Sequence, residues 1–211
     1  MLIMICMPIG GGVIKARTHE DYVGLWDFTT AMFRTAPYRG TQLGRVQLCG
    51  PYVSANRQRM ADGALDAGAD ALMWLDADQT FPKETILRLL KHDLPIVGAT
   101  YRKREAPLYQ FMLPCLDGKI QEDRDVVDNL AYLPGGCHLV RKEVYQVMEW
   151  PYYRADFGVD PAKPRMFTGE DVFFGLKARE AGFKIHCDMI LTDEIGHMLD
   201  HEFKGGAHVA T

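Results

Sequence analysis

ALMWLDADQTFP, residues 71–82, is the stretch from which the fold can be inferred. Five apolar residues, Ala71 to Leu75, are followed by two aspartates separated by one alanine, Asp76 and Asp78. A short unbroken apolar run of this kind predicts a strand buried in the middle of a parallel sheet. The aspartates would then lie at the carboxyl end of that strand, which is the edge where open α/β sheets bind ligands.

The spacing of Asp76 and Asp78 also indicates a chemistry. Residues i and i+2 of an extended backbone project to the same side, so both carboxylates would face one ligand. Two anionic oxygen donors on one side suit Mg²⁺ or Mn²⁺ held together with substrate phosphates. The alternative is that both aspartates only cap the turn and a helix beginning near Thr80, because acidic residues favour such positions.

The composition indicates one sizeable core. The chain has 211 residues, of which 47% are hydrophobic, and a formal net charge of −4. This charge argues against a protein that grips nucleic acid mainly through a basic surface. Five scattered cysteines form no CxxC pair, which favours reduced thiols in a cytoplasmic protein. No apolar run approaches the ~18 residues that a membrane span needs.

Strands and helices are expected to alternate along the first half of the chain. Apolar runs and helical spacing predict strands at 2–7, 45–49 and 94–99, and helices over 20–36, over 54–68 and from residue 82. This alternation predicts an α/β fold with a mostly parallel central sheet flanked by helices. The side chains expected in the sheet core include Ile3, Leu72, Trp74, Ile96 and Val97.

Two segments near the predicted sheet edge suit an anionic ligand. Residues 8–12 (PIGGG) form a loop that permits close backbone approach, although it has neither GxGxxG nor P-loop spacing. Asn56, Arg57 and Arg59 lie in the first turns of the next helix, where cations are not favoured. The two arginines together suggest an anionic partner, whereas a solvated surface position is the favoured explanation for either one alone.

The second half carries three further features. The basic run that begins at Tyr101 (YRKRE) follows a predicted strand, so it is either a solvated loop or a contact for phosphate or an anionic acceptor. LPGGCHLVR predicts a Gly-Gly turn and a strand, in which His138 is either a cleft residue or a structural histidine. Residues 168–171 (TGED) resemble a capping box; alternatively, they bring Glu170 and Asp171 to the mouth of a cleft.

Four features occur together in one order. They are an apolar strand ending in DAD, the segment GGCHLVRKEVY, the segment TGEDVFFGLKAREAGFKIHCD, and a late Gly-His pair at 196–197. This combination resembles the GT-A fold nucleotide-sugar glycosyltransferases, in particular the broad inverting family with many small phage and bacterial members. The similarity covers roughly residues 2–197. It implies a single GT-A domain with a nucleotide-binding half at 1–100, an acceptor-binding half at 101–197 and a C-terminal tail at 198–211.

The resemblance implies roles for individual residues. Asp78 and His197 would coordinate Mn²⁺ or Mg²⁺, and Asp76 would join this metal site through a metal-bound water or bind the ribose. Asp171 would be the base that deprotonates the acceptor hydroxyl, with Glu170 beside it. The residues that would border the nucleotide sugar, besides Asp76, are Pro8, Ile9, Gly10, Asn56, Arg57, Arg59, Gly135 and Gly136.

The expected function is transfer of a sugar, with inversion, from a UDP-sugar or GDP-sugar to an acceptor hydroxyl. The acidic residue that often follows the first strand in this family has no clear counterpart, so the base of the donor stays open. The QxxRW motif of processive synthases is missing. The acceptor is a glycan, a protein, a lipid-linked sugar or modified DNA, and the net charge does not point to nucleic acid. Two alternatives are a nucleotidyltransferase-like enzyme and a catalytically degenerate binding module.

Overall fold

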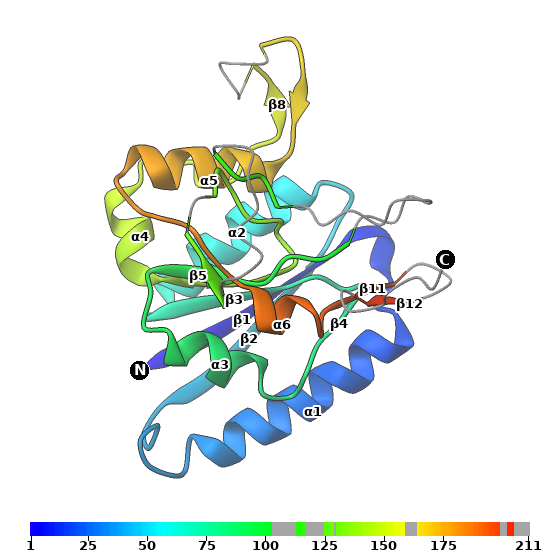
Figure 1. Ribbon diagram of the computed structural model, residues 1–211, viewed down its shortest axis with the longest axis vertical. Coiled ribbons are helices and arrows are strands. Elements are labelled where there is room, and N and C mark those ends of the chain that lie inside the picture. The colour runs from blue at the N-terminus through cyan, green and yellow to red at the C-terminus, as the bar shows by residue number, and fades with distance from the viewer. Residues whose placement is uncertain (103–112, 117–124, 129, 159–163, 199–201, 205–211) are drawn as a thin grey trace.

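The computed structural model describes residues 1–102, 113–116, 125–128, 130–158, 164–198 and 202–204. Within these ranges a seven-stranded central sheet has helices on both faces (Figure 1). No helix among the described residues is long and apolar enough to cross a membrane. The strands of the central sheet are β1 (Leu2–Ile9), β2 (Gln42–Cys49), β3 (Ala71–Leu75), β5 (Ile96–Gly98), β6 (Val126–Val127), β7 (Cys137–Arg141) and β10 (His186–Asp188).

Five strands of the central sheet run in one direction and two run in the other. The order is β2-β1-β3-β7-β5-β10-β6. β1 is parallel to β2 and β3, and β10 is parallel to β5. β7 is antiparallel to both β3 and β5, and β6 is antiparallel to β10. The prediction of a mostly parallel sheet is confirmed, with β7 inserted against the common direction next to β3.

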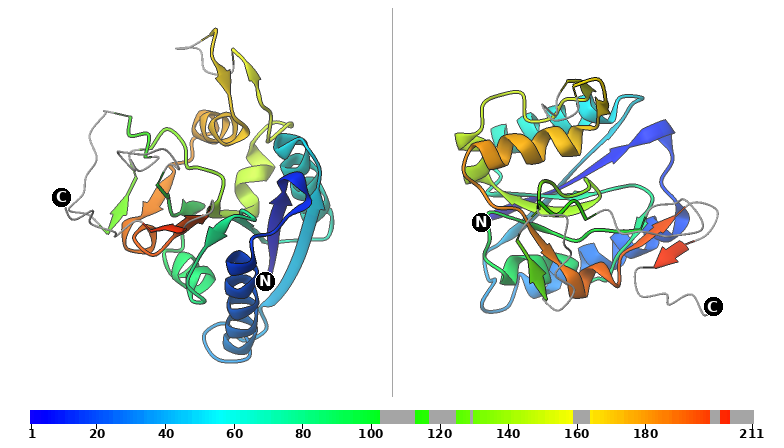
Figure 2. Two further views of the ribbon diagram at one scale, coloured as in Figure 1. Left: turned by 90° about the vertical axis from the view of Figure 1, so that its right-hand side faces the viewer. Right: turned by 45° about the horizontal axis from the view of Figure 1, so that its top comes forward.

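The helices cover the two faces of the sheet in separate groups (Figures 1 and 2). One face carries α1 (Ala16–Met32), α3 (Thr85–Lys91) and α6 (Met189–Thr192), and the other carries α2 (Val53–Asp66), α4 (Lys142–Val147) and α5 (Glu170–Glu180). A short 3-10 turn, η1 (Gly10–Gly12), connects β1 towards α1. Each group of helices packs its apolar side chains into its own core cluster.

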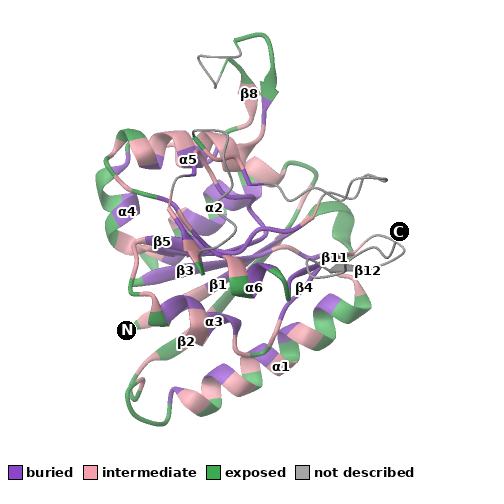
Figure 3. Ribbon diagram, in the orientation of Figure 1, coloured by how far each residue is buried: buried purple, intermediate pink, exposed green. Residues whose placement is uncertain are grey.

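The central strand β3 contributes to both cores, as its period of two requires. Ala71, Met73 and Leu75 pack on the α1 side, whereas Leu72 and Trp74 pack on the α2 side. Every residue of β3 is buried, and the sheet appears as a buried layer between exposed helix surfaces (Figure 3). The five side chains predicted for the core, Ile3, Leu72, Trp74, Ile96 and Val97, are all at most 1% exposed.

A second, smaller sheet begins directly after the DAD motif. β4 (Gln79–Thr80) pairs antiparallel with β11 (Gly196–Met198), and β11 pairs with β12 (Glu202–Lys204). The alternative of a helix beginning near Thr80 is therefore wrong. The helix expected from Pro82 begins at Thr85, whose backbone N–H and hydroxyl both donate to the carbonyl oxygen of Pro82. This small sheet brings His197 opposite Gln79, one residue beyond Asp78.

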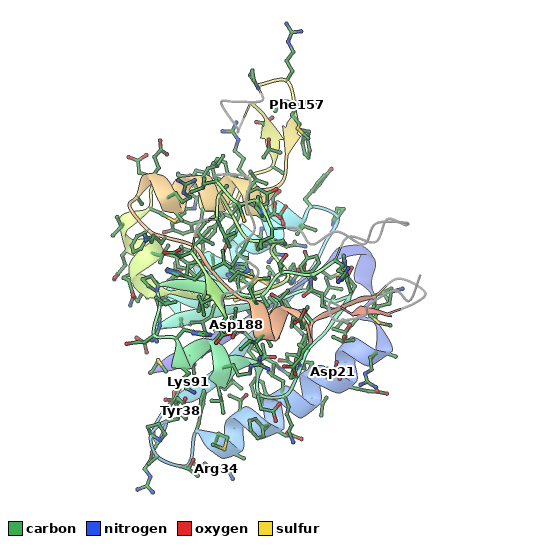
Figure 4. The ribbon with its side chains drawn as sticks, in the orientation of Figure 1. Asp21, Arg34, Tyr38, Lys91, Phe157 and Asp188 are labelled. Atoms are coloured by element: carbon green, nitrogen blue, oxygen red, sulfur yellow. The ribbon has the colours of Figure 1, made fainter. Side chains whose placement is uncertain are left out.

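A hairpin of two short strands projects from the body of the molecule. β8 (Asp156–Phe157) pairs with β9 (Phe167–Thr168), and Figure 4 places Phe157 on this hairpin, away from the central sheet. The rings of Phe157 and Phe167 meet edge to face at 5.5 Å and are both exposed. β9 ends one residue before Gly169, where the backbone enters α5. The hairpin therefore leads directly to the GED motif.

Candidate active site

The carboxyl end of β3 opens into a cavity of about 410 Å³. It is bordered by the Gly-rich turn after β1, the first turns of α2, the DAD motif, and the first turn of α5. The predicted site residues that line it are Pro8, Gly10, Arg57, Asp76, Asp78, Gly135, Glu170 and Asp171. The structure therefore brings the two acidic motifs, DAD and GED, to one cavity from opposite halves of the chain.

Five predicted residues lie outside the described lining of this cavity: Ile9, Asn56, Arg59, Gly136 and His197. Asn56 is buried and its amide donates to the carbonyl oxygen of Gly50 at 3.2 Å, which ties the turn before α2 to the helix. The carbonyl oxygen of Gly136 accepts from the backbone N–H of Asp76 at 2.9 Å. Gly136 thus supports the DAD motif through the backbone, while Arg59 is exposed.

A buried arginine joins the two acidic motifs. Arg57 is 1% exposed, its Nη2 donates to Asp76 Oδ1 at 2.6 Å, and its Nε donates to Glu170 Oε1 at 3.0 Å. Burial by itself would lower the pKa of Arg57, but Asp76 and then Glu170 raise it above its usual value. The predicted anionic partner of this arginine is therefore present within the protein, in the form of two carboxylates.

The guanidinium lies between a glycine and an aromatic ring. A Cβ at position 135 would lie 2.5 Å from Nη2 and 2.8 Å from Cζ of Arg57, so glycine is needed at this position. Cζ of Arg57 lies 5.2 Å from the centre of the Trp74 ring, within range of a cation–π interaction. Trp74 in turn donates from Nε1 to the hydroxyl of Tyr145 at 3.0 Å. Gly135 therefore accommodates the arginine as well as bordering the cavity.

Asp171 lies in the first turn of α5 and does not form the capping box that its spacing from Thr168 suggested. The N-cap of α5 is Gly169, without a side-chain cap, and the hydroxyl of Thr168 donates to Met166 O at 3.4 Å. Asp171 Oδ1 accepts from the backbone N–H of Val172 at 2.8 Å. Burial, and then the negative charge of Glu170, raise the pKa of Asp171 to about 6.

Asp78 faces the imidazole of His197. Oδ2 of Asp78 lies 4.0 Å from Nε2 of His197, and the two side chains are 32% and 12% exposed. Nδ1 of His197 lies 3.1 Å from the carbonyl oxygen of Arg102, which can only accept, so Nδ1 carries the proton in this contact. In the neutral ring Nε2 then presents its lone pair towards the Asp78 side, which is the arrangement found in histidine metal ligands.

The residues at this point fit a divalent ion that completes its shell from a ligand. Within the described part of the chain, no group of three or more His, Cys, Asp or Glu side chains is placed to hold a metal. A carboxylate and one neutral imidazole supply two donors, and an ion such as Mn²⁺ or Mg²⁺ takes up to six. Phosphate oxygens and water are suitable for the remaining positions.

Several lining residues were missed by the sequence reasoning. They are Val13, Lys15, Val53, Ala77 and Tyr101. Tyr101 is 6% exposed, and its ring meets the imidazole of His197 edge to face at 4.6 Å. Burial, followed by the charges of Asp76 and Asp171, raises the pKa of its hydroxyl well above the usual value. Its position at the end of a predicted strand, next to the basic run, was the signal that could have identified it.

Two other candidates from the sequence are His138 and the basic run that begins at Tyr101. His138 is 4% exposed, stacks on Trp74 at 6.3 Å, and has its pKa lowered to about 3 by burial and by Arg57. It is the structural histidine of the two alternatives. Of the basic run, Arg102 supports His197 through its carbonyl oxygen, and residues 103–104 lie outside the described residues.

Comparison with known proteins gives a fold and no family. No protein-family model matches the sequence, and no curated protein matches it. The chain is similar to the solved structure of A197 from STIV, with 16% identity and a TM-score of 0.61 over 100% of this chain and 97% of that chain. A nucleoside-diphosphate-sugar pyrophosphorylase from Vibrio cholerae RC9 has 10% identity and a TM-score of 0.42, over 92% of this chain and 94% of that chain. The likeness to A197 shows that the two proteins share this α/β fold over their whole length.

Proposed function

We propose that this protein is a metal-dependent glycosyltransferase of the GT-A type, which moves a sugar from a nucleotide-diphosphate donor to an acceptor hydroxyl. The observation that carries the proposal is the meeting of Asp78 and Asp171 in one cavity, in two different environments. Asp78 faces an imidazole, as a metal ligand would, whereas Asp171 is a half-buried acid with a pKa of about 6, as suits a general base.

The donor side is formed by the Gly-rich turn, Lys15 and the DAD motif. The cavity of about 410 Å³ lies within the range of small-molecule sites. Lys15 supplies a cation that can contact the diphosphate, since Arg57 is already engaged by two protein carboxylates. A divalent ion bound beside Asp78 and His197 would neutralise charge that develops on the leaving diphosphate. Asp76 keeps its second carboxylate oxygen for the ribose or for a metal-bound water.

Asp171 performs the acceptor half of the reaction. Above pH 6 it is largely ionised and can take a proton. The acceptor oxygen forms a bond to the anomeric carbon while the bond from that carbon to the diphosphate oxygen breaks, and the diphosphate leaves with the electron pair. The acceptor proton passes to Asp171 late in this step, because a sugar hydroxyl is a far weaker acid than a carboxylic acid. The products are a glycoside and a nucleoside diphosphate.

A nucleotidyltransferase is the second candidate, and Lys15 is the observation that favours it. Such enzymes commonly place a cationic side chain near a Gly-rich loop after the first strand, and Lys15 lines the cavity beyond the Gly10–Gly12 turn. That reaction would join a sugar phosphate to a nucleoside triphosphate and release pyrophosphate. The two candidates therefore differ in the phosphorus-containing product.

The test is a panel of UDP-sugars and GDP-sugars in a thermal-shift assay with Mn²⁺ or with EDTA, followed by ³¹P NMR of the products. The glycosyltransferase proposal expects stabilisation by one donor only with the metal present, and slow release of the nucleoside diphosphate. Pyrophosphate formed from a nucleoside triphosphate and a sugar phosphate would support the second candidate instead. Stabilisation without any turnover would indicate a binding module with a degenerate site.

A further inference from the structure

Two neighbouring carboxylates stand at the start of α5, and the proposed reaction needs only one of them as a base. Glu170 and Asp171 both line the cavity. The two carboxylates have different hydrogen-bond donors. Nε of Arg57 donates to Glu170 Oε1, whereas the backbone N–H of Val172 donates to Asp171 Oδ1. A guanidinium is always charged, so its hydrogen bond to Glu170 is charge-assisted and holds that side chain in place.

We infer that Arg57 is a positioning residue that gives these two carboxylates different roles, holding the Glu170 side chain in one place and leaving Asp171 to receive the acceptor proton. The inference rests on the proposed function, because the base is needed for transfer to a hydroxyl. Arg57 does this without touching the reacting atoms, through its bond to Glu170. The second acid of the GED motif is then the catalytic one.

The geometry of Arg57 is specific to an arginine. Two different nitrogens of one rigid planar group contact carboxylates that lie directly after β3 and on α5, at 2.6 Å and 3.0 Å. A lysine has a single ammonium, which cannot occupy both nitrogen positions. One face of the guanidinium is closed by Gly135, where a Cβ would be 2.5 Å from Nη2, and the Trp74 ring lies 5.2 Å from Cζ. The side chain is therefore held in one orientation, which fixes the position of Glu170.

The side chains that contact Trp74 further stabilise the orientation of the Arg57 guanidinium. Trp74 Nε1 donates to Tyr145, and the hydroxyls of Tyr145 and Tyr153 lie 2.9 Å apart. Tyr153 also stacks on Phe174 of α5 at 5.0 Å, with an angle of 8° between the ring planes. The helix that carries Glu170 and Asp171 is thus packed against the same aromatic cluster that supports the guanidinium.

Within the described part of the chain, charged and titratable groups around Asp171 come from four elements. They are Glu170 on its own helix, Arg57 on α2, Asp76 after β3, and the hydroxyl of Tyr101 after β5. Next to burial, the negative charge of Glu170 is the largest influence that raises the pKa of Asp171. Neutralising Glu170 should therefore lower the pKa of Asp171, whereas removing the positive charge of Arg57 should raise it.

The decisive variants are Glu170→Gln, Arg57→Lys and the double variant, in the full chain. Arg88→Lys is the matched control, because Arg88 forms an ion pair with Glu194 at 2.6 Å outside the cavity. Donor binding is measured by calorimetry, and kcat and KM for donor turnover are measured from about pH 5 to about pH 9. Thermal unfolding shows whether each variant folds.

We expect Glu170→Gln to bind donor and turn it over, with the acid limb of its pH profile moved down by about one unit. Arg57→Lys should lower kcat by about 10- to 100-fold with little change in KM, as is typical for a residue that supports a catalytic group. The double variant should be no slower than Arg57→Lys alone, because Arg57→Lys already removes the contact through which Glu170 is held beside Asp171. Arg88→Lys should leave kcat and its pH profile unchanged.

A ¹³C NMR titration of the Asp171 carboxyl tests the same inference without any turnover. The pKa of Asp171 should be near 6 in the native protein and lower in Glu170→Gln. An unchanged titration in Glu170→Gln, or a loss of turnover as severe as that of Asp171→Asn, would overturn the inference. Absence of turnover in the native protein, with the titration as expected, would instead count against the proposed function. If Arg57→Lys does not fold, Glu170→Gln and the titration still decide.

Discussion

The DAD motif after β3 and the GED motif at the start of α5 each contain two acidic residues, and the first and second acids have different contacts in the same way in both motifs. In each pair, the first acid contacts Arg57: Asp76 at 2.6 Å and Glu170 at 3.0 Å. The second acid of each pair lines the cavity and is not among the partners of Arg57. One guanidinium therefore anchors both motifs through the first acid of each.

The second acids of the two motifs, Asp78 and Asp171, differ in their surroundings. Asp78 is 32% exposed and faces the imidazole of His197, which suits a hard cation with water and phosphate ligands. Asp171 is placed where burial and Glu170 raise its pKa to about 6, which suits proton transfer near neutral pH. In the proposed function, the environment, more than the residue type, distinguishes the aspartate proposed as metal ligand from the aspartate proposed as base.

The largest expected effect is on turnover in Asp171→Asn. Turnover should fall by about two to four orders of magnitude, because the variant keeps the shape of the side chain but cannot accept a proton. Donor binding should stay near the native value. Glu180→Gln, an exposed acid at the other end of the same helix, is the control and should be silent. An active Asp171→Asn enzyme would remove the difference between the two motifs.

Replacement of His197 should affect the metal side alone. In His197→Ala, we expect the affinity for Mn²⁺ in the presence of a nucleoside diphosphate to fall by about 10- to 100-fold. The pH at which Asp171 ionises should not move, since the imidazole is not among the groups that shift its pKa. His19→Ala, an exposed histidine on α1, is the control. A shift in the acid limb of the pH profile of His197→Ala would show that the proposed metal site and the ionisation of Asp171 are coupled.

The pH dependence expected for the proposed activity follows from the raised pKa of Asp171. A base is active when it is deprotonated, so kcat/KM should be half-maximal near pH 6, nearly constant above about pH 7, and fall below pH 6. The fall should approach about tenfold for each pH unit. A rate that is level down to pH 4 would mean that Asp171 ionises at its ordinary value and that its surroundings do not raise it.

The smallest effect is on stability. The pKa of Asp171 is raised in the folded state, so ionising it costs more there than in the unfolded chain. This cost is absent below about pH 4, grows as the pH rises, and is complete above about pH 6. Asp171→Asn should therefore stabilise the protein by about 1–2 kcal/mol at pH 8, after allowance for partial solvent screening, and by much less at pH 4. Equal stabilisation at both values would contradict the sign of the shift.

Some features of the molecule followed from sequence patterns because the pattern had one physical explanation. The run Ala71 to Leu75 is apolar at every position, and only burial on both faces accounts for it. β7 was predicted as a strand, but its antiparallel place between β3 and β5 was not, because an apolar run carries no direction. The helix after Pro82 was placed three residues early, since proline is also common in the turn that precedes a helix.

The candidate site was predicted only in part, because local sequence patterns do not report contacts between distant residues. An arginine near a helix N-terminus predicted an anion, but its partner Glu170 is 113 residues away, and no local pattern reports such a distance. Thr168 and Asp171 have the spacing of a capping box, yet Gly169 is the N-cap of α5. Asp171 instead lines the cavity, and the local spacing of residues carries no information about that cavity. Lys15 and Tyr101 were not among the predicted site residues, because a single lysine or tyrosine after a strand has many uses.

The central claim is that Asp78 and His197 form an incomplete metal site, which the diphosphate of a nucleotide donor completes. The direct test is calorimetric titration of Mn²⁺ into the native protein and into Asp78→Asn, with and without UDP or GDP, with Asp27→Asn as the exposed control. We expect tight binding of Mn²⁺ only with the nucleoside diphosphate, and none in a folded Asp78→Asn variant. Equal binding of the nucleoside diphosphate in EDTA and in Mn²⁺, or an unaffected Asp78→Asn variant, would contradict the claim.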